Sequence, residues 1–415
     1  MPKPELLAPA GDMEKLRVAL AYGADAVYIG GQEYSLRARA GNFSADELPL
    51  AVDYAHSLGK KLYVAVNVFA HNEDIKRLPA YLKLLAAAAP DALIISDLGV
   101  FALAQQYAPN LPLHISTQAN TVNWQSAAMW ARLGAKRVIL GRELTLVEAA
   151  KISAQAGLET EIFVHGAMCM AYSGRCFMSN YLAKRDANRG DCAQPCRWRY
   201  ALQEEKRPGE FLPVEEDERG GYILNSKDLC LIEALPAIIT SGISAVKIEG
   251  RNKSAYYIAN VTRVYRAALD AAYAAAKDYT VHDEWRRELT KISHRAYTTG
   301  FAFEQPSEEG QRYATSDPIR CYDYVATALA IEPGKLVLRQ RNHFALGDTL
   351  ELLLPPPNGG QLDLVITLLY GEAGENLNAA IHPGMIVWLP LTVKQHKTLA
   401  QYAPPLVARR AARQN

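Results

Sequence analysis

The chain has 415 residues, a formal net charge of +1, 49% hydrophobic residues and 21% charged residues. This length suits one large domain and one small one. The balanced charge gives no global field that attracts nucleic acid, no stretch is apolar enough to cross a bilayer, and the N-terminus lacks the apolar core of a signal peptide. We therefore expect a cytoplasmic protein, in which clustered cysteines bind metal or act in catalysis rather than form disulfides.

Short apolar runs recur from the start of the chain, and helical or long intervening sequence separates them. The eight runs are Glu5–Ala8, Ala26–Ile29, Lys61–Val66, Ala92–Ile95, Leu113–Ser116, Arg137–Leu140, Glu161–Val164 and Ala245–Ile248. Such runs are typical of strands buried on both faces. Eight βα units predict a (β/α)8 TIM-barrel-like catalytic domain over residues 1–305. The alternative is an open doubly wound sheet, but no GxGxxG follows the first run.

The gap between the seventh and eighth runs, about 166–243, is far longer than the others, and long insertions of this kind are usually functional. After it, Ser254–Ala276 predicts a helix on the barrel exterior. From 312 to 400 the pattern changes to strands divided by turn signals, which predicts a small C-terminal all-β barrel domain. These strands are Tyr324–Ile331, Lys335–Arg339, Asp348–Leu354, Leu362–Leu368 and Met385–Leu389. Residues 401–415 are basic, and we expect a disordered tail.

Polar residues follow six of the eight predicted barrel strands. They are Asn67, Asp97, Gln118, Arg142, Glu143, His165, Glu249 and Arg251. In a barrel these positions converge at the carboxyl ends of the strands, where active sites lie. Arg142 and Arg251 rank first among them, because a guanidinium binds carboxylate or phosphate through paired hydrogen bonds. Polar residues also mark strand ends that have no function, so each position alone is weak evidence.

Four of the six cysteines fall in one window after the seventh strand, with the spacing C-x6-C-x15-C-x3-C: Cys169, Cys176, Cys192 and Cys196. Four thiolates can hold zinc or an iron–sulfur cluster. Only the second pair is spaced like a zinc knuckle, which slightly favours the cluster. Cys230 lies further on, so five cysteines compete for four places, and either Cys192 or Cys230 could be the spare one. Cys321 stands apart, and we expect an inert thiol.

Basic and aromatic residues surround this window, including Tyr172, Lys184, Arg197 and Trp198. Such a mixture can contact phosphates and stack on bases, and it is equally typical of a solvated basic surface. A protease needs a nucleophile and a base. His165 lies near Ser173 in sequence, but no G-x-S-x-G or H-E-x-x-H supports this interpretation.

The cysteine window resembles a known family. Its motif is Glu161-x-Phe163-x-x-Gly166-Ala-Met-Cys169-x4-Gly174-x-Cys176-x-Met178-Ser179, which is similar to the signature of peptidase family U-32. Further stretches resemble the branch of this family that hydroxylates tRNA: Glu5-Leu-Leu-Ala-Pro-Ala-Gly11, Asn188–Trp198, Asn225–Leu229 and Lys247-Ile-Glu-Gly-Arg251. The likeness covers most of the chain.

The resemblance implies an enzyme that forms 5-hydroxyuridine at the tRNA wobble position, depends on prephenate as co-substrate or hydroxyl source, and carries a [4Fe-4S] cluster. The implied ligands are Cys169, Cys176, Cys192 and Cys196, with Cys230 as a substitute. It also leaves two alternatives, a U-32 (collagenase-like) peptidase and an RNA-binding module with structural zinc.

On this interpretation each candidate residue has an expected role. Arg142 and Arg251 hold the carboxylates of prephenate, a small dicarboxylate. The basic stretch from Lys184 to Arg199 holds the tRNA anticodon arm, and Tyr172 or Trp198 stacks on a flipped base. The remaining substrate-binding candidates are Gln118, Asn67 and Arg197, and the catalytic candidates are His165, Glu143 and Tyr172.

Overall fold

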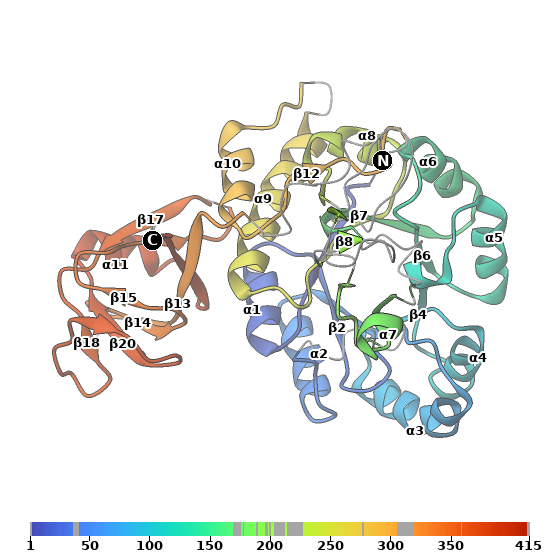
Figure 1. The fold of residues 1–415 in the computed structure, drawn as a ribbon, viewed down its shortest axis with the longest axis horizontal. Helices are drawn as coiled ribbons and strands as arrows, with labels where there is room; N and C mark the ends of the chain where they lie inside the picture. The colour runs from blue at the N-terminus through green and yellow to red at the C-terminus, as the bar shows by residue number, and fades with distance from the viewer. Residues whose placement is uncertain are drawn as a thin grey trace.

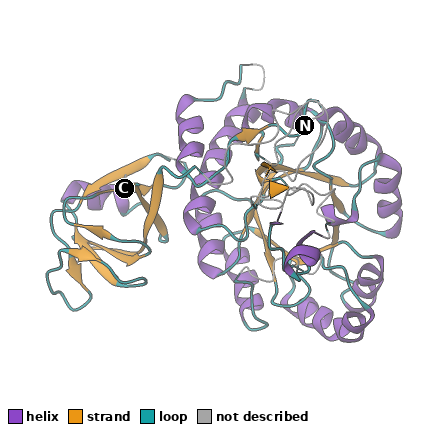
Figure 2. Ribbon diagram, in the orientation of Figure 1, coloured by secondary structure: helices purple, strands orange, loops and turns teal. Residues whose placement is uncertain are grey.

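The computed structural model describes residues 2–35, 41–168, 176, 178–187, 190–195, 198, 201–202, 212–213, 227–275, 278–304, 319–357 and 359–412. Eight parallel strands form a closed barrel, because β11 pairs with both β1 and β7. Helices surround the strands (Figures 1 and 2). The barrel strands are β1 (Glu5–Pro9), β2 (Ala26–Gly30), β3 (Lys61–Val66), β4 (Ala92–Ile95), β5 (Leu113–Ile115), β6 (Arg137–Ile139), β7 (Glu159–Ala167) and β11 (Ala245–Ile248). The predicted barrel and its eight strands are confirmed.

Several barrel helices begin where the sequence supplies an N-terminal cap. Asp12 accepts from the Lys15 backbone, and Thr145 and Glu148 form a reciprocal capping box. The helices are α1 (Met13–Ala21), α2 (Glu47–Ser57), α3 (Asn72–Ala88), α4 (Leu98–Tyr107), α5 (Trp124–Leu133), α6 (Leu146–Gln155), α8 (Leu235–Thr240), α9 (Ala255–Ala274) and α10 (Asp283–Lys291). The predicted exterior helix is α9, which Ser254 caps. Among the described residues, no helix has the length and apolar character needed to span a bilayer.

The long insertion extends the barrel at one point. Its strand β10 (Asp228–Cys230) runs antiparallel to the end of β7, so that Cys230 lies opposite His165, and β12 (Tyr297–Thr298) pairs with β10. The insertion also carries α7 (Met178–Ala183), which projects inside the ring of barrel helices in Figure 1. The sequence analysis did not predict β10. It places the segment that follows the cysteine window at the carboxyl end of the barrel.

The C-terminal domain is all-β, as predicted, and is built on a curled seven-stranded antiparallel sheet. Its strand order is β17 (Gln361–Val365), β16 (Thr349–Leu353), β21 (Leu406–Ala411), β13 (Tyr322–Glu332), β14 (Lys335–Gln340), β20 (Ile386–Pro390) and β18 (Tyr370–Gly371). Strands β15 (Phe344–Ala345) and β19 (Ala379–Ala380) form a separate pair, and α11 (Val393–Leu399) precedes β21.

The expected disordered tail is wrong for residues 406–411, which form β21 between β13 and β16. Its basic residues are buried because other elements supply their partners. Arg409 pairs with Glu288 of α10 at 2.6 Å and with Glu351 of β16 at 2.8 Å. Arg410 pairs with Asp348 at 2.7 Å. These arginines therefore hold the sheet together and join it to the barrel.

The two domains also meet through Tyr22, a fully buried residue that follows α1. Its hydroxyl donates to the Leu353 carbonyl at 2.8 Å and accepts from the Val407 backbone at 3.0 Å. The C-terminal domain is thus fixed to the end of α1 and to α10 by buried polar contacts.

Candidate active site at the carboxyl end of the barrel

Strand-end residues of β3, β4 and β5 contact one another at the barrel opening. The Asn67 side chain donates to Ser116 Oγ at 3.3 Å, and the same oxygen accepts from the Gln118 backbone at 3.3 Å. Ser96 donates to the Asn67 carbonyl at 3.1 Å. Asn67 and Gln118 are therefore brought to one side of the opening, as the barrel geometry predicts.

Arg142 joins the ends of β6, β7 and β11. Its guanidinium pairs with Glu249 at 3.1 Å, donates to the Ala167 carbonyl at 3.0 Å and lies 3.9 Å from the centre of the Phe163 ring. Glu143, the next residue, is half-buried. An anion that binds Arg142 would share this guanidinium with Glu249, since a planar guanidinium has five donors.

Arg251 occupies a different part of the opening. It is 4% exposed, and a Cβ added at Gly30 would lie 1.9 Å from its Nη1 and 2.4 Å from Ser35 Oγ. Only glycine at the end of β2 leaves room for this guanidinium. Arg251 therefore lies over β2, whereas Arg142 lies over β7 and β11. The two predicted carboxylate-binding arginines approach the opening from different strands.

His165 is enclosed by aromatic rings rather than open to solvent. The ring centres of Tyr257, Tyr265 and Tyr297 lie 6.0, 5.4 and 5.3 Å from its own. Burial lowers the pKa of His165 to about 3, so the imidazole is neutral at pH 7. Among the described residues, its Nδ1 has no hydrogen-bond partner.

Cys230 faces the same aromatic group. Its Sγ lies 3.7 Å from the Tyr265 hydroxyl, which also donates to the Val164 carbonyl at 2.8 Å. Burial raises the pKa of the Cys230 thiol, which favours the protonated form over the thiolate that binds metals.

Of the predicted ligands, Cys176 and Cys192 are described, and Cys169 and Cys196 lie outside the described residues, as do Tyr172 and Arg197. Cys176 is half-buried just before α7, and Cys192 is exposed. Trp198 is also exposed. Within the part of the chain that is described, no three His, Cys, Asp or Glu side chains form a metal site. The four-cysteine ligand set stays a prediction.

Helix α7 and the segment that carries Cys192 are held together. The buried Ser179 hydroxyl accepts from the Ala193 backbone at 2.9 Å. Arg185 pairs with Asp191 at 2.9 Å and donates to the Cys192 carbonyl at 3.2 Å. Helix α7, which follows Cys176, and the segment that carries Cys192 are therefore fixed to each other.

The barrel and its cysteine-bearing insertion can now be compared with known proteins. Residues 11–312 match Peptidase family U32, and residues 320–400 match the Peptidase family U32 C-terminal domain.

The chain belongs to peptidase family U32.

Three relatives of this U32 protein have descriptive names. "tRNA hydroxylation protein P1" of Bacillus subtilis is 41% identical over 94% of this chain and 93% of its own length. "tRNA hydroxylation protein P" of Escherichia coli is 40% identical over 94% of each chain. "23S rRNA 5-hydroxycytidine C2501 synthase" of Escherichia coli is 34% identical over 74% of this chain and 46% of its own length. These three names agree with the predicted hydroxylase.

The sequence analysis of this U32 protein missed a charged group inside the barrel. Glu161 is fully buried and pairs with Lys247 at 2.9 Å and Arg137 at 3.1 Å, and Arg137 continues to Glu5 at 2.7 Å. Burial lowers the pKa of the nearby His114 well below its usual range. The signal was present in the sequence, because charged residues interrupt otherwise apolar strands, and a buried charge needs a partner.

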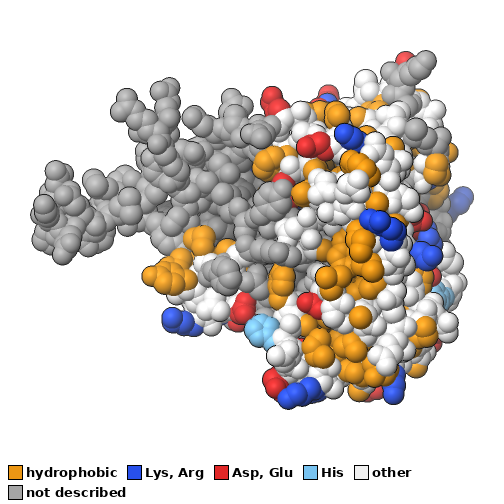
Figure 3. Space-filling model, turned by 90° about the vertical axis from the view of Figure 1, so that its right-hand side faces the viewer, with side chains coloured by type: hydrophobic (Ala, Val, Ile, Leu, Met, Phe, Trp, Pro, Cys, Tyr) orange, Lys and Arg blue, Asp and Glu red, His pale blue; other side chains and the backbone are white. Residues whose placement is uncertain are grey.

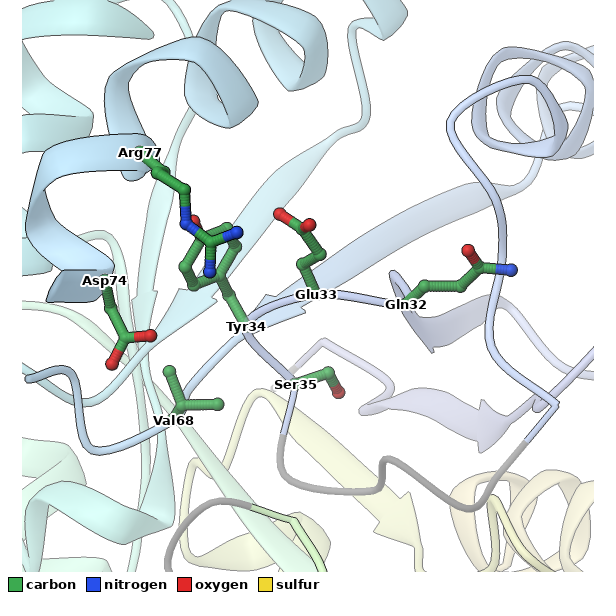
Figure 4. A pocket seen from close by; sticks show the side chains of 7 residues that line it. All are labelled: Gln32, Glu33, Tyr34, Ser35, Val68, Asp74 and Arg77. Carbon is green, nitrogen blue, oxygen red and sulfur yellow. The ribbon is translucent and has the colours of Figure 1, made fainter.

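A cavity of about 190 Å³ beside the opening was also not predicted from the sequence. Figure 4 shows the seven residues that line it: Gln32, Glu33, Tyr34, Ser35, Val68, Asp74 and Arg77. No motif marks these residues, so nothing in the sequence pointed to them.

Proposed function

We propose that this protein is an RNA-modifying hydroxylase that converts a wobble uridine of tRNA into 5-hydroxyuridine. The observation that carries the proposal is the 40–41% identity, over 94% of the chain, to two proteins named for tRNA hydroxylation. The rRNA hydroxycytidine synthase is a more distant relative, and its name describes hydroxylation at the same carbon of a pyrimidine ring. The shared chemistry replaces a C5–H bond by C5–OH and removes two electrons from the base. The proposed hydroxyl source, prephenate, would accept these two electrons as it gives up its hydroxyl group.

We further propose that Cys169, Cys176, Cys192 and Cys196 hold a [4Fe-4S] cluster. Four thiolates are the usual donor set for such a cluster, and it supplies one-electron transfer when bound. The hydrogen bonds between α7 and the Cys192 segment support the assignment, because they hold the helix that follows Cys176 against the segment that carries Cys192. The enclosed thiol of Cys230 makes it the weaker fifth candidate.

Prephenate is the proposed co-substrate, with Arg142 and Arg251 as its carboxylate partners. Both guanidiniums lie at strand ends of the opening, and both are shielded from solvent. Shielding strengthens the attraction between a guanidinium and a carboxylate. Arg142 lies over β7 and β11, whereas Arg251 lies over β2. This arrangement suits a ligand whose two carboxylates point in different directions.

The proposed RNA contacts lie on the insertion. The described face in Figure 3 carries scattered charges of both signs, so we expect RNA to bind through a local surface. Lys184 is exposed, Tyr181 of α7 is 80% exposed, and Trp198 is 45% exposed. Exposed aromatic side chains beside a cation suit the stacking of unpaired bases.

Within this scheme the chain's own residues orient and enclose the reactants. His165, neutral and surrounded by tyrosines, can accept or donate a hydrogen bond without adding charge. Glu143 is the carboxylate nearest in sequence to Arg142, and we propose that it takes the proton released when C5–H is replaced.

Nucleoside analysis of tRNA tests the proposal. A strain that lacks the protein should lose 5-hydroxyuridine and its derivatives, and wild-type protein should restore them. Cys192→Ser should fail to restore them, whereas Cys321→Ser, a second exposed cysteine outside the window, should succeed. Persistence of these nucleosides in the deletion strain, with no second pathway, would contradict the assignment.

The cofactor needs its own measurement. Protein purified without oxygen should be brown and contain about four iron and four sulfide per chain. A colourless protein with one zinc would favour the RNA-binding alternative, and peptide hydrolysis that disappears in His165→Ala would favour the peptidase alternative.

A further inference from the structure

The cavity beside the opening has features that suit a ligand rather than packing. It lies between the loop after β2, which carries Gln32 to Ser35, and helix α3, which carries Asp74 and Arg77. Figure 4 shows the Arg77 side chain of α3 reaching toward that loop. Both elements follow carboxyl ends of barrel strands, so the cavity opens at the catalytic end of the barrel.

Two residues that line this cavity, Tyr34 and Ser35, have buried hydroxyls with no hydrogen-bond partner among the described residues, and so does Tyr81, which packs against Tyr34. Tyr34 is 7% exposed and Ser35 is 4% exposed. Buried hydroxyls are normally paired, and exceptions cluster at functional sites. Tyr34 also has a φ of +58°, a left-handed conformation that a bulky residue rarely adopts. The loop therefore holds unsatisfied groups in a strained backbone.

The charges around the cavity exclude a strong anion site. Glu33 and Asp74 contribute two carboxylates, and Arg77 contributes one guanidinium to the lining. A second guanidinium lies nearby, because Arg251 Nη1 lies against Gly30 beside Ser35. A dianion here would face two carboxylates. A neutral ligand with both hydrogen-bond donors and acceptors would meet complementary groups instead.

The size of the cavity and its aromatic lining limit the class of ligand that can bind. At about 190 Å³ the cavity is smaller than the roughly 300–1,000 Å³ of sites for drug-sized ligands, so it suits a single ring. The Tyr34 ring lines the cavity and packs against the Tyr81 ring, whose centre lies 5.1 Å away at a 45° angle. Enzymes that flip a base read its edge with hydrogen bonds and hold its faces against aromatic or apolar side chains.

We propose that this cavity receives the uracil ring of the uridine to be modified, an assignment that rests on the proposed function. The two carbonyl oxygens of uracil match the hydroxyl donors of Tyr34 and Ser35. Its N3–H matches a carboxylate acceptor, for which Glu33 is available. Arg251 lies beside Ser35, so the co-substrate proposed to bind Arg142 and Arg251 would adjoin the uracil ring on this side of the cavity.

Photocrosslinking tests the location without depending on turnover. An anticodon stem-loop RNA with 4-thiouridine at the wobble position is irradiated with the full-length protein, and the crosslinked peptide is identified by mass spectrometry. We expect crosslinks within residues 32–35 or 74–81. Crosslinks confined to other segments would overturn the assignment.

Variants test the hydroxyls. Tyr34→Phe and Ser35→Ala should each lower kcat/KM for tRNA about 5- to 10-fold, the usual effect of losing one neutral hydrogen bond, while thermal unfolding stays unchanged or rises. Tyr273→Phe, an exposed tyrosine of α9, is the matched control and should behave as wild type. Wild-type rates in both cavity variants would also overturn the assignment and leave the hydroxylase function standing. A wild-type protein that leaves tRNA unmodified would instead overturn the function, and the assignment with it.

Discussion

The ion pair between Glu161 and Lys247 in the barrel interior gives the sharpest stability prediction. The two side chains are 0% and 5% exposed and 2.9 Å apart. At an effective dielectric constant of about 20, their attraction is about 6 kcal/mol, and desolvation of the two ions offsets much of it. Glu161→Gln removes the attraction and leaves Lys247 charged and buried. Arg137 keeps Glu5 and Glu159 as partners.

We expect Glu161→Gln to lower the free energy of unfolding by about 3–5 kcal/mol, the usual cost of breaking a buried pair. The Lys247 ammonium lies 4.2 Å from the centre of the Tyr28 ring, and this cation–π contact remains in the variant. We therefore expect a loss of stability at the lower end of this range. The double variant Glu161→Leu with Lys247→Met removes both charges, and we expect it to lose less than the single variant.

Urea unfolding at pH 7, followed by far-UV circular dichroism, measures these differences when the slopes match. Glu73→Gln is the control, because Glu73 and Lys76 form an exposed pair 2.8 Å apart that contributes at most about 0.5 kcal/mol. A loss below about 1 kcal/mol in Glu161→Gln, or a double variant as unstable as the single one, would refute the reasoning.

Three further predictions concern acid stability, backbone space and the domain junction. Burial raises the pKa of Glu288, but hydrogen bonds and charges from the neighbouring arginines outweigh this and lower it from 4.5 to about 2. The ionised Glu288 therefore contributes fully to the free energy of unfolding above pH 4.5, and this contribution is lost as the pH falls toward 2. Between about pH 5 and pH 2, the free energy of unfolding of the wild type should fall by about 3 kcal/mol more than that of Glu288→Gln, as measured by unfolding at a series of acid pH values. Gly30→Ala should cost about 1–3 kcal/mol because the added Cβ displaces Arg251; an unchanged melting temperature would contradict the close approach. Tyr22→Phe should lose about 1–3 kcal/mol in urea unfolding, since a buried carbonyl and amide lose their shared partner, and wild-type stability would show that these contacts are not needed.

The barrel could be predicted from the sequence because each of its strands is a local signal. The runs from Glu5 to Ile248 are apolar enough to mark strands buried on both faces, and their number sets the closure. Strand β21 could not be predicted in this way. Arg409 and Arg410 make it resemble a solvated tail, and it becomes a strand only because Glu288, Glu351 and Asp348 supply partners from distant positions.

The same contrast holds at the site. Strand-end positions such as Asn67 and Arg142 were predictable, since the fold brings every carboxyl strand end to one opening. Their partners were not, because the pairing of Arg142 with Glu249 depends on side-chain packing across three strands. The cavity at Tyr34 could not be predicted from the sequence for a related reason. A hydroxyl without a partner is a property of its surroundings, and the sequence shows only the tyrosine.

Strand β21 also bears on how the protein is made. Every barrel element precedes it along the chain, yet Glu288 and Tyr22 of the barrel domain complete their contacts only with residues 407–409. During synthesis the barrel can form before its side of the junction is satisfied, and until residue 411 has been added the C-terminal sheet lacks the strand between β13 and β16. A ribosome that stalls within β20 or α11 therefore leaves a nascent chain in which Glu288 lacks its Arg409 partner and two strand edges are exposed. Those are features by which quality-control proteases and chaperones recognise unfinished proteins.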